Sequence, residues 1–428
     1  MEDMYRYLLS YLDQESIDNL KEEMEKPNPY KGLFLNRRRC PEKVVIEEFK
    51  TLRQDSVDKD LYRYDPSIDF PGRNPLYDAG AYYILDPSSS KTSLSLGAGR
   101  KEVVLDMCSA PGGKTIAFAL RNPGSLIVAN DISASRAEEL SKNVERMGLD
   151  NVIVTSLAPQ RFIDYGLADF FSSIILDAPC SGTGMFRKEE KMKDDWSYEK
   201  AMKLLPIQDE LLEKAYELVK PNGTILYSTC SYLKEEDEDR LAFFTDKHKD
   251  ISIRPIRKEE GFYFGTVPGT VHLFPSLFKG EGHFFSLLTK SGEDSGTYET
   301  YKKAEFSPEL NLFIIKTDKG RYGISRPIRQ LISLPFLRCG IKLTDTSKYA
   351  KIKEDHALSH YLIDRPSLEL DIEEAERYLR GEEFKKDGIN LPDGSILISY
   401  KGVNLGFGLK KGARIRNMYP KGLRYFSL

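Results

Sequence analysis

The sequence predicts an α/β fold built on a parallel sheet with helices on both faces. Continuous apolar runs of four to six residues follow one another from about residue 100, helical segments separate them, and clusters of small and reactive residues come directly after several runs. Continuous runs, as opposed to alternating ones, are typical of strands that are buried on both faces. Ligands bind to such sheets beyond the carboxyl ends of the strands, so the clusters are the first candidates for a functional site.

Six apolar runs are predicted to be strands of this sheet, and the segments 135–147 and 206–218 are predicted to be helices between them. The last run closes the sheet region, and the polar stretch 290–305 after it is predicted to be a linker. The six runs are 102–107, 125–130, 151–154, 173–177, 223–227 and 283–288.

The region before the sheet, residues 1–75, is predicted to be an N-terminal extension. It is polar and charged, and its apolar residues have helical spacing, as at Tyr5, Leu8 and Leu12. The segment 33–39 is a short apolar run that ends in three arginines. Such a basic trio is either a charged surface or, beside a nucleic-acid site, a grip on phosphates.

The region after the linker, residues 306–428, is predicted to be a separate module of short strands with one helix near 371–379. With the extension and a sheet region at 76–290, it makes three domains. This number agrees with a length of 428 residues at roughly 150 residues per domain.

The composition excludes several classes of protein. Apolar residues make up 40% of the chain and charged residues 30%, which excludes wholesale disorder, and no apolar run approaches the roughly 18 residues that span a bilayer. The acidic N-terminus lacks the features of a secretory signal. The five cysteines have neither metal-ligand spacing nor the density of a disulfide framework. We therefore expect a cytoplasmic protein without a membrane partner, and a monomer because no coiled coil or exposed apolar stripe is evident.

The charge is distributed unevenly along the chain. Residues 394–428 contain seven basic side chains and no acidic ones, so subtracting them from the net charge of -3 leaves -10 for residues 1–393. This asymmetry favours a C-terminal surface that meets a polyanion. A solvated basic strand pair without a partner is the alternative, and charge alone leaves both open.

The first cluster, DMCSAPGGKT at 106–115, follows the first predicted strand. Small residues at this point allow the backbone to approach a ligand closely before the next helix begins. The spacings of a P-loop and of G-x-G-x-x-G are both absent. Glycine-rich turns also serve as plain connections in α/β proteins, so this turn alone is weak evidence of a ligand site.

The second predicted strand ends in Asn130 and Asp131. A carboxylate at this position can accept hydrogen bonds from both hydroxyls of a ribose. Alternatively, Asp131 caps the helix that starts near Ser133. Together with the first cluster, Asp131 favours a nucleoside cofactor.

Two further clusters each place a cysteine just past a buried strand. They are DAPCSGTG at 177–184, which contains Cys180, and YSTCS at 227–231, which contains Cys230. Either cysteine alone could be a small buried apolar residue. Two at neighbouring strand ends, with Asp177 three residues before one of them, favour chemistry in which a thiolate attacks an electron-poor carbon and a carboxylic acid manages protons.

These motifs carry a family resemblance. DMCSAPGGKT, NDIS, LDAPCSGTG and YSTCS, in that order, resemble the RNA cytosine-5 methyltransferase family, the Nol/Nop/Sun group. GAYYILDPSS at 80–89, KGEGHFF at 279–285 and YPKGLR at 419–424 resemble its bacterial branch, which methylates small-subunit (16S) ribosomal RNA. The similarity runs from about residue 30 to the C-terminus. It implies a Rossmann-like class I methyltransferase sheet, a helical and basic N-terminal extension, and a C-terminal α+β PUA-like RNA-binding module at about 385–428.

The resemblance implies roles for the residues near the cysteines. Cys230 would be the nucleophile that adds to carbon 6 of a cytosine, and Asp177 would bond to the N3 side of the ring. Cys180 would assist loss of the carbon 5 proton and release of Cys230. Because a free thiol has a pKa of about 8.5, Cys230 needs help to ionise, and Lys114 is the candidate. The target base would be single-stranded or flipped out.

The resemblance also implies S-adenosyl-L-methionine as the cofactor, with Asp131 on the ribose, Arg136 in support and Asp177 at the edge of the site. At Ala158 the chain departs from the family, which often has an acidic residue near the adenine there; backbone groups or Ser156 would then hold the adenine. The cofactor loop would be Cys108, Ser109, Ala110, Pro111, Gly112, Gly113 and Lys114.

The implied function is methylation of carbon 5 of cytosine in 16S ribosomal RNA through a covalent Cys–cytosine adduct, with ribosomal RNA or the small subunit as partner. One alternative is a catalytically weak RNA-binding ribosome assembly factor, which Ala158 alone favours. Another is a tRNA cytosine-5 methyltransferase. A DNA cytosine methyltransferase would use Cys180 as nucleophile, and the second cysteine, Cys230, argues for RNA.

Other candidates carry less. His356 and His360 have i, i+4 spacing but no third ligand nearby, so a surface or packing role is expected and no metal site is predicted. Tyr419, Tyr425 and Phe426 interleave with basic residues. They are either stacking platforms for RNA or the core of a small barrel.

Overall fold

The computed structural model describes residues 2–26, 31–56, 58–97, 102–293, 296–344, 355–362 and 364–424. The chain divides into two compact units that do not follow its order. The first unit contains Met1–Gly32, Leu85–Ala137 and Thr155–Tyr298. The second contains Leu33–Ile84, Glu138–Val154 and Glu299–Leu428.

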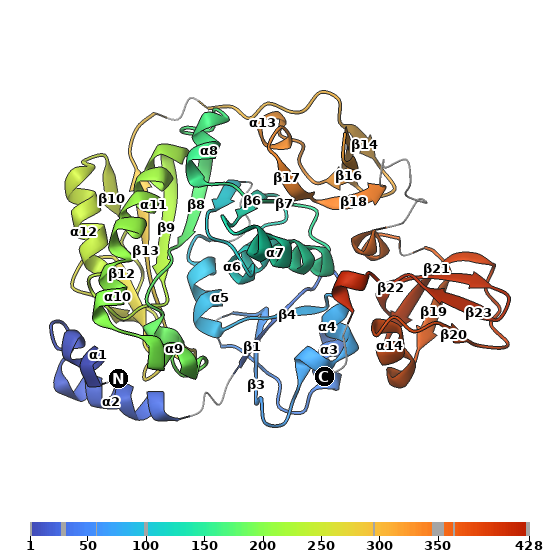
Figure 1. Cartoon of the computed structure of the whole chain (residues 1–428), viewed down its shortest axis with the longest axis horizontal. Helices are drawn as coiled ribbons and strands as arrows, with labels where there is room; N and C mark the ends of the chain where they lie inside the picture. The colour runs from blue at the N-terminus through green and yellow to red at the C-terminus, as the bar shows by residue number, and fades with distance from the viewer. Residues whose placement is uncertain are drawn as a thin grey trace. The chain divides into compact units, whose positions relative to one another are not determined.

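A mixed sheet forms the centre of the first unit, and β8, β9 and β13 run side by side in it (Figure 1). Strands β5, β6, β8 and β9 are parallel, as predicted, whereas β13 is antiparallel to β9. The predicted parallel arrangement is wrong for β13, because after the helix that follows β9 the chain forms three further short strands, β10 to β12, and β13 then pairs antiparallel with both β12 and β9. In spatial order the strands are β11 (Tyr263–Phe264), β12 (Thr270–Leu273), β13 (His283–Lys290), β9 (Val219–Thr229), β8 (Phe171–Asp177), β5 (Val103–Asp106) and β6 (Leu126–Asn130), with β10 (Ile251–Ile253) paired to β13.

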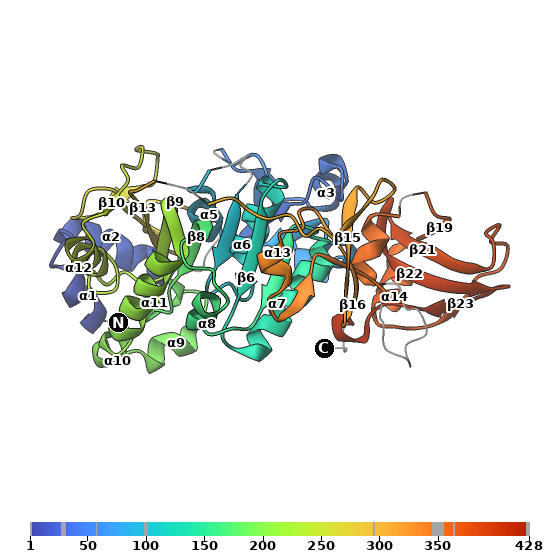
Figure 2. The ribbon, with the colours of Figure 1, turned by 90° about the horizontal axis from the view of Figure 1, so that it is seen from above.

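Helices pack on this sheet. Helix α11 (Leu205–Leu218) contacts β8 and β9, with α8 (Pro159–Asp164) and α12 (Glu238–Lys247) next to it (Figure 2). Helix α5 (Pro87–Leu94) contacts α6 (Gly113–Arg121) and β13. The predicted helices 135–147 and 206–218 correspond to α7 (Ala134–Met147) and α11. Two short helices, α9 (Glu190–Asp195) and α10 (Tyr198–Met202), follow the Cys180 loop.

The N-terminal helices belong to the first unit. In α1 (Glu2–Leu8) and α2 (Gln14–Glu25) the apolar residues at helical spacing are buried, and they form one core with Phe186, Tyr232 and Phe274. The helical expectation for this segment is therefore confirmed. Phe186 and Tyr232 come from the loops that follow the cysteines, so these helices support the region of the predicted site.

In the second unit, one apolar core joins residues 33–82 to residues 368–419. The early segment supplies a sheet of β2 (Arg53–Gln54), β3 (Leu61–Tyr64), β1 (Lys31–Leu35) and β4 (Tyr82–Ile84), with α3 (Glu42–Glu48) and α4 (Pro75–Asp78). The late segment supplies β19 (Ser367–Leu370), β21 (Gly394–Tyr400), β22 (Val403–Lys411), β23 (Arg414–Asn417) and β20 (Phe384–Lys385), with α14 (Ile372–Leu379). In sequence, the elements between these two segments include β14 (Glu305–Ser307), β15 (Leu312–Thr317), β16 (Gly320–Ile324), α13 (Arg329–Ile332), β17 (Phe336–Cys339) and β18 (Ile341–Thr344). Strand β17 is the neighbour of β7 (Val152–Thr155).

The three arginines after β1 are engaged within the second unit. Arg37 pairs with Asp60 at 2.6 Å and Arg38 with Asp150 at 2.8 Å. Arg39 donates to backbone oxygens, among them that of Ala79, and burial lowers its pKa to about 9. These contacts within the protein favour a structural role for the three arginines over a grip on phosphates.

The C-terminal candidates that the structure describes are buried residues. His356 and His360 are buried with ring centroids 5.3 Å apart, so they pack, as expected. Tyr419 is buried as well and contacts the ring of His356, which makes it a core residue. Tyr425 and Phe426 lie outside the described residues. Among the described residues, no helix is long and apolar enough to cross a membrane.

Candidate active site

The loop after β5 takes the shape that its small residues allow. Gly112 has a φ of 111°, a conformation that side chains rarely adopt, and α6 begins at the next residue. The Ala110–Pro111 peptide bond is cis. Beneath the loop, Thr115 donates to Asp106 at 2.6 Å and shares a 2.8 Å hydrogen bond with Ser109. These buried hydrogen bonds therefore hold the loop in its conformation. Its cysteine, Cys108, remains a thiol because burial raises its pKa.

Asp131 lies at the end of β6, and its two carboxylate oxygens have different surroundings. Oδ1 accepts a hydrogen bond from the backbone N–H of Ser133 at 3.0 Å, which holds the turn before α7. Oδ2 is buried and accepts no hydrogen bond within the described ranges, although Arg136 approaches to 3.5 Å. Arg136 also donates to the carbonyl of Ala110 at 2.6 Å. The two interpretations of Asp131 are thus compatible: one oxygen organises the helix start, and the other can accept from a ribose hydroxyl.

The loop after β7 faces the same strand ends. Asn130 accepts from the backbone N–H of Leu157 at 2.9 Å and so ties this loop to β6. Ala158 is the N-cap of α8 and provides no side-chain hydrogen bond. Ile132, which the sequence reasoning passed over, is 70% exposed beside Asp131. Its position next to Asp131, the carboxylate predicted to bind a ribose, was the available signal, since an exposed apolar side chain there can cover one face of a purine.

Asp177 ends β8 and is paired with the lysine of the cofactor loop. The Nζ of Lys114 lies 2.7 Å from Oδ2, and the hydroxyl of Ser228 donates to Oδ1 at 2.8 Å. Burial by itself would raise the pKa of Asp177, but the charge and hydrogen bond of Lys114, together with His283 and the hydrogen bond from Ser228, outweigh burial and lower it. Lys114 also bonds to His283 at 2.9 Å, a residue that the sequence reasoning missed as a site residue. Its charge is directed at the carboxylate, whereas we expected it to assist Cys230.

The two predicted cysteines meet at the ends of β8 and β9. Their sulfur atoms are 3.1 Å apart, and both are free thiols. The backbone N–H of Cys230 also points to the sulfur of Cys180 at 3.2 Å. The contact with Cys230, and then burial, raise the pKa of Cys180 well above its usual value, so Cys180 remains a thiol.

A buried glutamate connects the two cysteine loops. The carboxylate of Glu236 accepts from the backbone and hydroxyl of Ser181 at 2.8 and 2.5 Å, and from the hydroxyl of Ser231 at 2.5 Å. Gln208 adds a fourth bond at 3.1 Å. Ser181 follows Cys180 and Ser231 follows Cys230, so Glu236 fixes the distance between the sulfurs. The acidic run 235–238 was the sequence signal for this residue.

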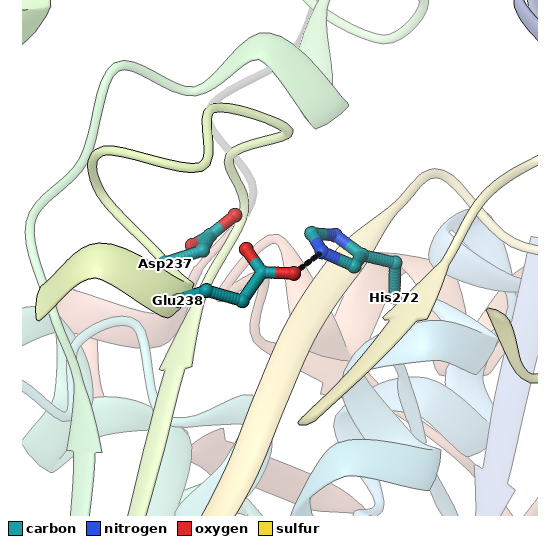
Figure 3. A group of neighbouring side chains, drawn as sticks. All are labelled: Asp237, Glu238 and His272. Atoms are coloured by element: carbon teal, nitrogen blue, oxygen red, sulfur yellow. Dashed lines mark hydrogen bonds and ion pairs between the residues drawn. The ribbon is translucent and has the colours of Figure 1, made fainter. Parts of the chain in front are cut away.

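Near Cys230 lies a buried trio of Asp237, Glu238 and His272 (Figure 3). Their potential ligand atoms lie within 4.8 Å of one another, a spacing that could hold a metal ion. However, His272 and Glu238 already pair at 2.9 Å. Burial, and then the charge of Glu238, raise the pKa of Asp237 well above its usual value, so a neutral Asp237 beside the His272–Glu238 hydrogen bond accounts for the cluster. Thr229, the residue before Cys230, donates to Asp237 at 2.6 Å.

Comparison with known proteins identifies the family. Residues 93–289 match the family described as 16S rRNA methyltransferase RsmB/F, and residues 365–425 match the methyltransferase RsmF PUA domain. The chain is 31% identical over 379 residues to ribosomal RNA small subunit methyltransferase F of Aliivibrio fischeri, covering 81% of this chain and 79% of that protein. The chain belongs to the 16S rRNA methyltransferase RsmB/F family. The predicted resemblance is therefore confirmed.

A further relative and two solved structures are also similar to this chain. The methyltransferase F of Shewanella sp. (strain MR-4) is 28% identical, covering 89% of each chain. The structure of a methyltransferase homologue from Pyrococcus horikoshii is 26% identical, with a TM-score of 0.56 over 67% of this chain and 93% of that one. NSun6 from the same organism, at 16% identity and a TM-score of 0.61 over 68% of this chain and 99% of that one, shares the fold.

Family membership confirms the predicted fold class, a Rossmann-like methyltransferase sheet with a C-terminal PUA domain, and the predicted cofactor, S-adenosylmethionine. The PUA match starts at residue 365, ahead of the predicted start at about 385, because β19 and α14 are part of the same sheet and core. The site fits this cofactor in one testable respect. Asp131 keeps a buried oxygen without a hydrogen-bond donor in the described part of the chain, where a ribose hydroxyl can supply one.

Proposed function

We propose that this chain methylates carbon 5 of a cytosine in 16S ribosomal RNA through a covalent bond between Cys230 and the base. The observation that carries the proposal is the 3.1 Å contact between the sulfurs of Cys180 and Cys230, next to a charged Asp177. A pair of sulfurs suits a reaction in which one forms a bond to the ring and the other assists its release.

The first step is addition of the Cys230 sulfur to carbon 6 of the cytosine. As the bond forms, electron density moves onto N3, which takes up the proton that Cys230 gives up, and the Asp177 carboxylate accepts hydrogen bonds from the N–H groups on the N3 side of the ring. Carbon 5 becomes an enamine carbon, nucleophilic enough to take a methyl group. The carbon 5 proton then leaves, the bond between carbon 6 and sulfur breaks, and Cys180 assists both events from its position beside Cys230.

When bound, S-adenosylmethionine supplies an electrophilic methyl group. Asp131 would hold its ribose through Oδ2, Arg136 would keep the carboxylate in place, and the backbone of the loop from Cys108 to Gly113 would line the site. Ile132 and the backbone around Ser156 would hold the adenine in place of the acidic residue that Ala158 replaces.

The PUA domain would position the RNA. In β23, Arg414 and Arg416 are 67% and 64% exposed, so their charges are available to phosphates despite contacts with Glu383. The division into residues 1–75, 76–290 and 306–428 stays part of this proposal, with the first and last regions as RNA-positioning parts. The place of action would be the cytoplasm, where small subunits are assembled.

Two cysteine variants test the chemistry. With labelled cofactor and unmethylated 16S ribosomal RNA, Cys180→Ala is expected to accumulate a protein–RNA adduct that survives denaturing gels, because attack proceeds and release is slow. Cys230→Ala is expected to give no adduct, and Cys339→Ala, a buried cysteine in β17, is expected to behave as the wild type. An adduct in Cys230→Ala and none in Cys180→Ala would overturn the roles.

A substrate comparison tests the rest. Labelled S-adenosylmethionine is supplied with small subunits, naked 16S ribosomal RNA and tRNA from cells that lack this protein. Label in either ribosomal substrate, recovered as 5-methylcytidine after digestion, supports the proposal. Label in tRNA alone would overturn the ribosomal substrate, and no label in any RNA would favour an assembly factor.

A further inference from the structure

A chain of buried polar groups leads from Asp177 away from the cysteines. The Lys114 ammonium, which pairs with Asp177, bonds to Nε2 of His283 at 2.9 Å. Nδ1 of His283 lies 3.2 Å from the hydroxyl of Ser88, and that hydroxyl bonds to Asp86. The side chains of Lys114, His283 and Ser88 are all buried, so water does not compete for these bonds.

The chemistry of the groups fixes the direction of every bond in this chain. An ammonium can only donate, so Nε2 of His283 must accept from Lys114. A neutral imidazole whose Nε2 accepts carries its proton on Nδ1, which therefore donates to Ser88. The hydroxyl of Ser88 is then free to donate to Asp86. Burial, and then the charge of Lys114, lower the pKa of His283 to about 3, so the ring stays neutral.

The far end of the chain is anchored by backbone groups. Asp86 is the N-cap of α5, where its Oδ1 accepts from the N–H groups of Ser88 and Ser89 at 2.9 and 3.3 Å. Its Oδ2 accepts from the N–H of Glu281 at 3.1 Å, two residues before His283. The position of His283 is thus set from both sides, by its own strand and by the start of α5.

A neutral partner has a specific consequence for Lys114. A buried ammonium needs acceptors for its N–H groups, but a second carboxylate would compete with Asp177 for its charge. An imidazole satisfies an N–H without neutralising the charge. The positive charge of Lys114 therefore remains available to Asp177.

We propose that His283 is a positioning residue, which holds the Lys114 ammonium against Asp177 so that the carboxylate meets the cytosine ring in its charged form. This inference rests on the proposed cytosine-5 methylation, in which Asp177 contacts the base. Neither Ser88 nor Asp86 touches the substrate in this scheme; they fix the tautomer of His283.

Two variants of His283 separate positioning from simple packing. His283→Phe fills the space but cannot accept from Lys114, whereas His283→Gln offers a carbonyl to Lys114 and an amide N–H to Ser88. We expect kcat of His283→Phe to fall about 10–100-fold, the size expected for a lost charged hydrogen bond. The KM for RNA should change less than about threefold, and the acid limb of the pH–rate profile should move to higher pH by about one unit. His283→Gln should recover kcat and the profile to within about threefold and a few tenths of a unit.

A packing role would instead lower the melting temperature in both variants and leave the shape of the profile unchanged, which would overturn the proposal. An active wild type with an equally active His283→Phe would overturn it too. Nitrogen-15 NMR of the wild type provides a measurement that is independent of activity, with His283 assigned by its absence in His283→Gln. A neutral ring protonated at Nδ1 between pH 6 and 8 is expected, and a charged ring or one protonated at Nε2 would overturn the proposal. A wild type that shows the expected tautomer but methylates no RNA would instead refute the proposed function.

Discussion

Replacing Lys114 by methionine removes one charge from the site and keeps the length of the side chain. In the wild type, the Lys114 Nζ lies 2.7 Å from Asp177 Oδ2. Coulomb's law at that distance gives about 6 kcal/mol for an effective dielectric constant of about 20. This is an upper limit, because the side chain of Asp177 is 34% exposed and water screens the pair.

The effect on the pKa of Asp177 follows from this discounted interaction. Loss of an opposite charge at hydrogen-bond distance raises a carboxyl pKa by about 1–3 units, and the exposure of Asp177 favours the lower half, about 1–2 units. At 1.36 kcal/mol per unit, this is about 1.4–2.7 kcal/mol. In the wild type the pKa is lowered, so Asp177 stays charged, and the benefit of the pair is lost only as pH falls through that lowered value. In Lys114→Met, burial loses its strongest opponent, so the pKa of Asp177 rises and its charge is lost at a higher pH than in the wild type.

The assay is single-turnover methyl transfer to 16S ribosomal RNA from pH 5 to pH 8.5. We expect the rate of Lys114→Met to approach a plateau at high pH and, as pH decreases, to begin falling at a higher pH than the wild-type rate does. Calorimetry with S-adenosylmethionine checks that cofactor binding survives, since Lys114 lies in the cofactor loop. Lys91→Met serves as the control. Lys91 is a partly buried lysine on α5, and its partner, Glu259, is not one of the residues around the two cysteines. A rate that falls equally at every pH would refute the reasoning, because Lys114 would then act on the substrate or cofactor and not on Asp177.

Three other variants probe separate parts of the molecule. Asp131→Asn keeps an oxygen for the turn before α7 but replaces Oδ2 by a donor, so the Kd for S-adenosylmethionine measured by calorimetry should rise about 10–150-fold. Gly184→Ala places a Cβ 2.9 Å from the carbonyl oxygen of Cys230, which must move, so kcat for methyl transfer should fall about 10–100-fold. Arg414→Glu with Arg416→Glu should weaken binding to ribosomal RNA and reduce the slope of log affinity against log salt concentration by about 1.4–1.8.

Controls and contrary results distinguish specific effects of these variants from general ones. A melting temperature of Asp131→Asn within about 2 °C of the wild type excludes a general loss of structure, and an unchanged Kd would contradict the ribose contact. Gly72→Ala places its Cβ 3.4 Å from Ile84, an ordinary contact, and should keep full activity. Lys43→Glu changes an exposed charge on α3 and should leave the salt slope unchanged, whereas an equal effect would mean that net charge alone governs RNA binding.

Much of the site could be predicted from local sequence. The four motifs lie at strand ends, and parallel strands bring those ends to one edge, so Asp131, Asp177, Cys180 and Cys230 could be placed together without any long-range information. The helices at 135–147 and 206–218 could also be predicted, because apolar periodicity is a signal within the helix itself.

The errors came from long-range packing. The direction of β13 depends on the path of the chain through β10 to β12, which short apolar runs do not encode. His283 is 169 residues from Lys114 in sequence, and a single histidine next to an apolar run gives no sign of its partner. The arginines at 37–39 appeared available for phosphates because their partners, such as Asp150, come from other segments of the second unit.

The pKa values at this edge of the sheet depend on where one cation lies. Asp106 and Asp177 end the adjacent parallel strands β5 and β8, and burial pushes both toward the neutral form. For Asp106 burial prevails, and its pKa rises to about 7, whereas for Asp177 the contact with Lys114 prevails and its pKa falls. The charge on Asp177 in turn helps to keep Asp106 neutral, because two buried carboxylates so close together disfavour double ionisation. By bonding to Asp177, Lys114 therefore determines which carboxyl is charged, and it selects the one three residues from Cys180.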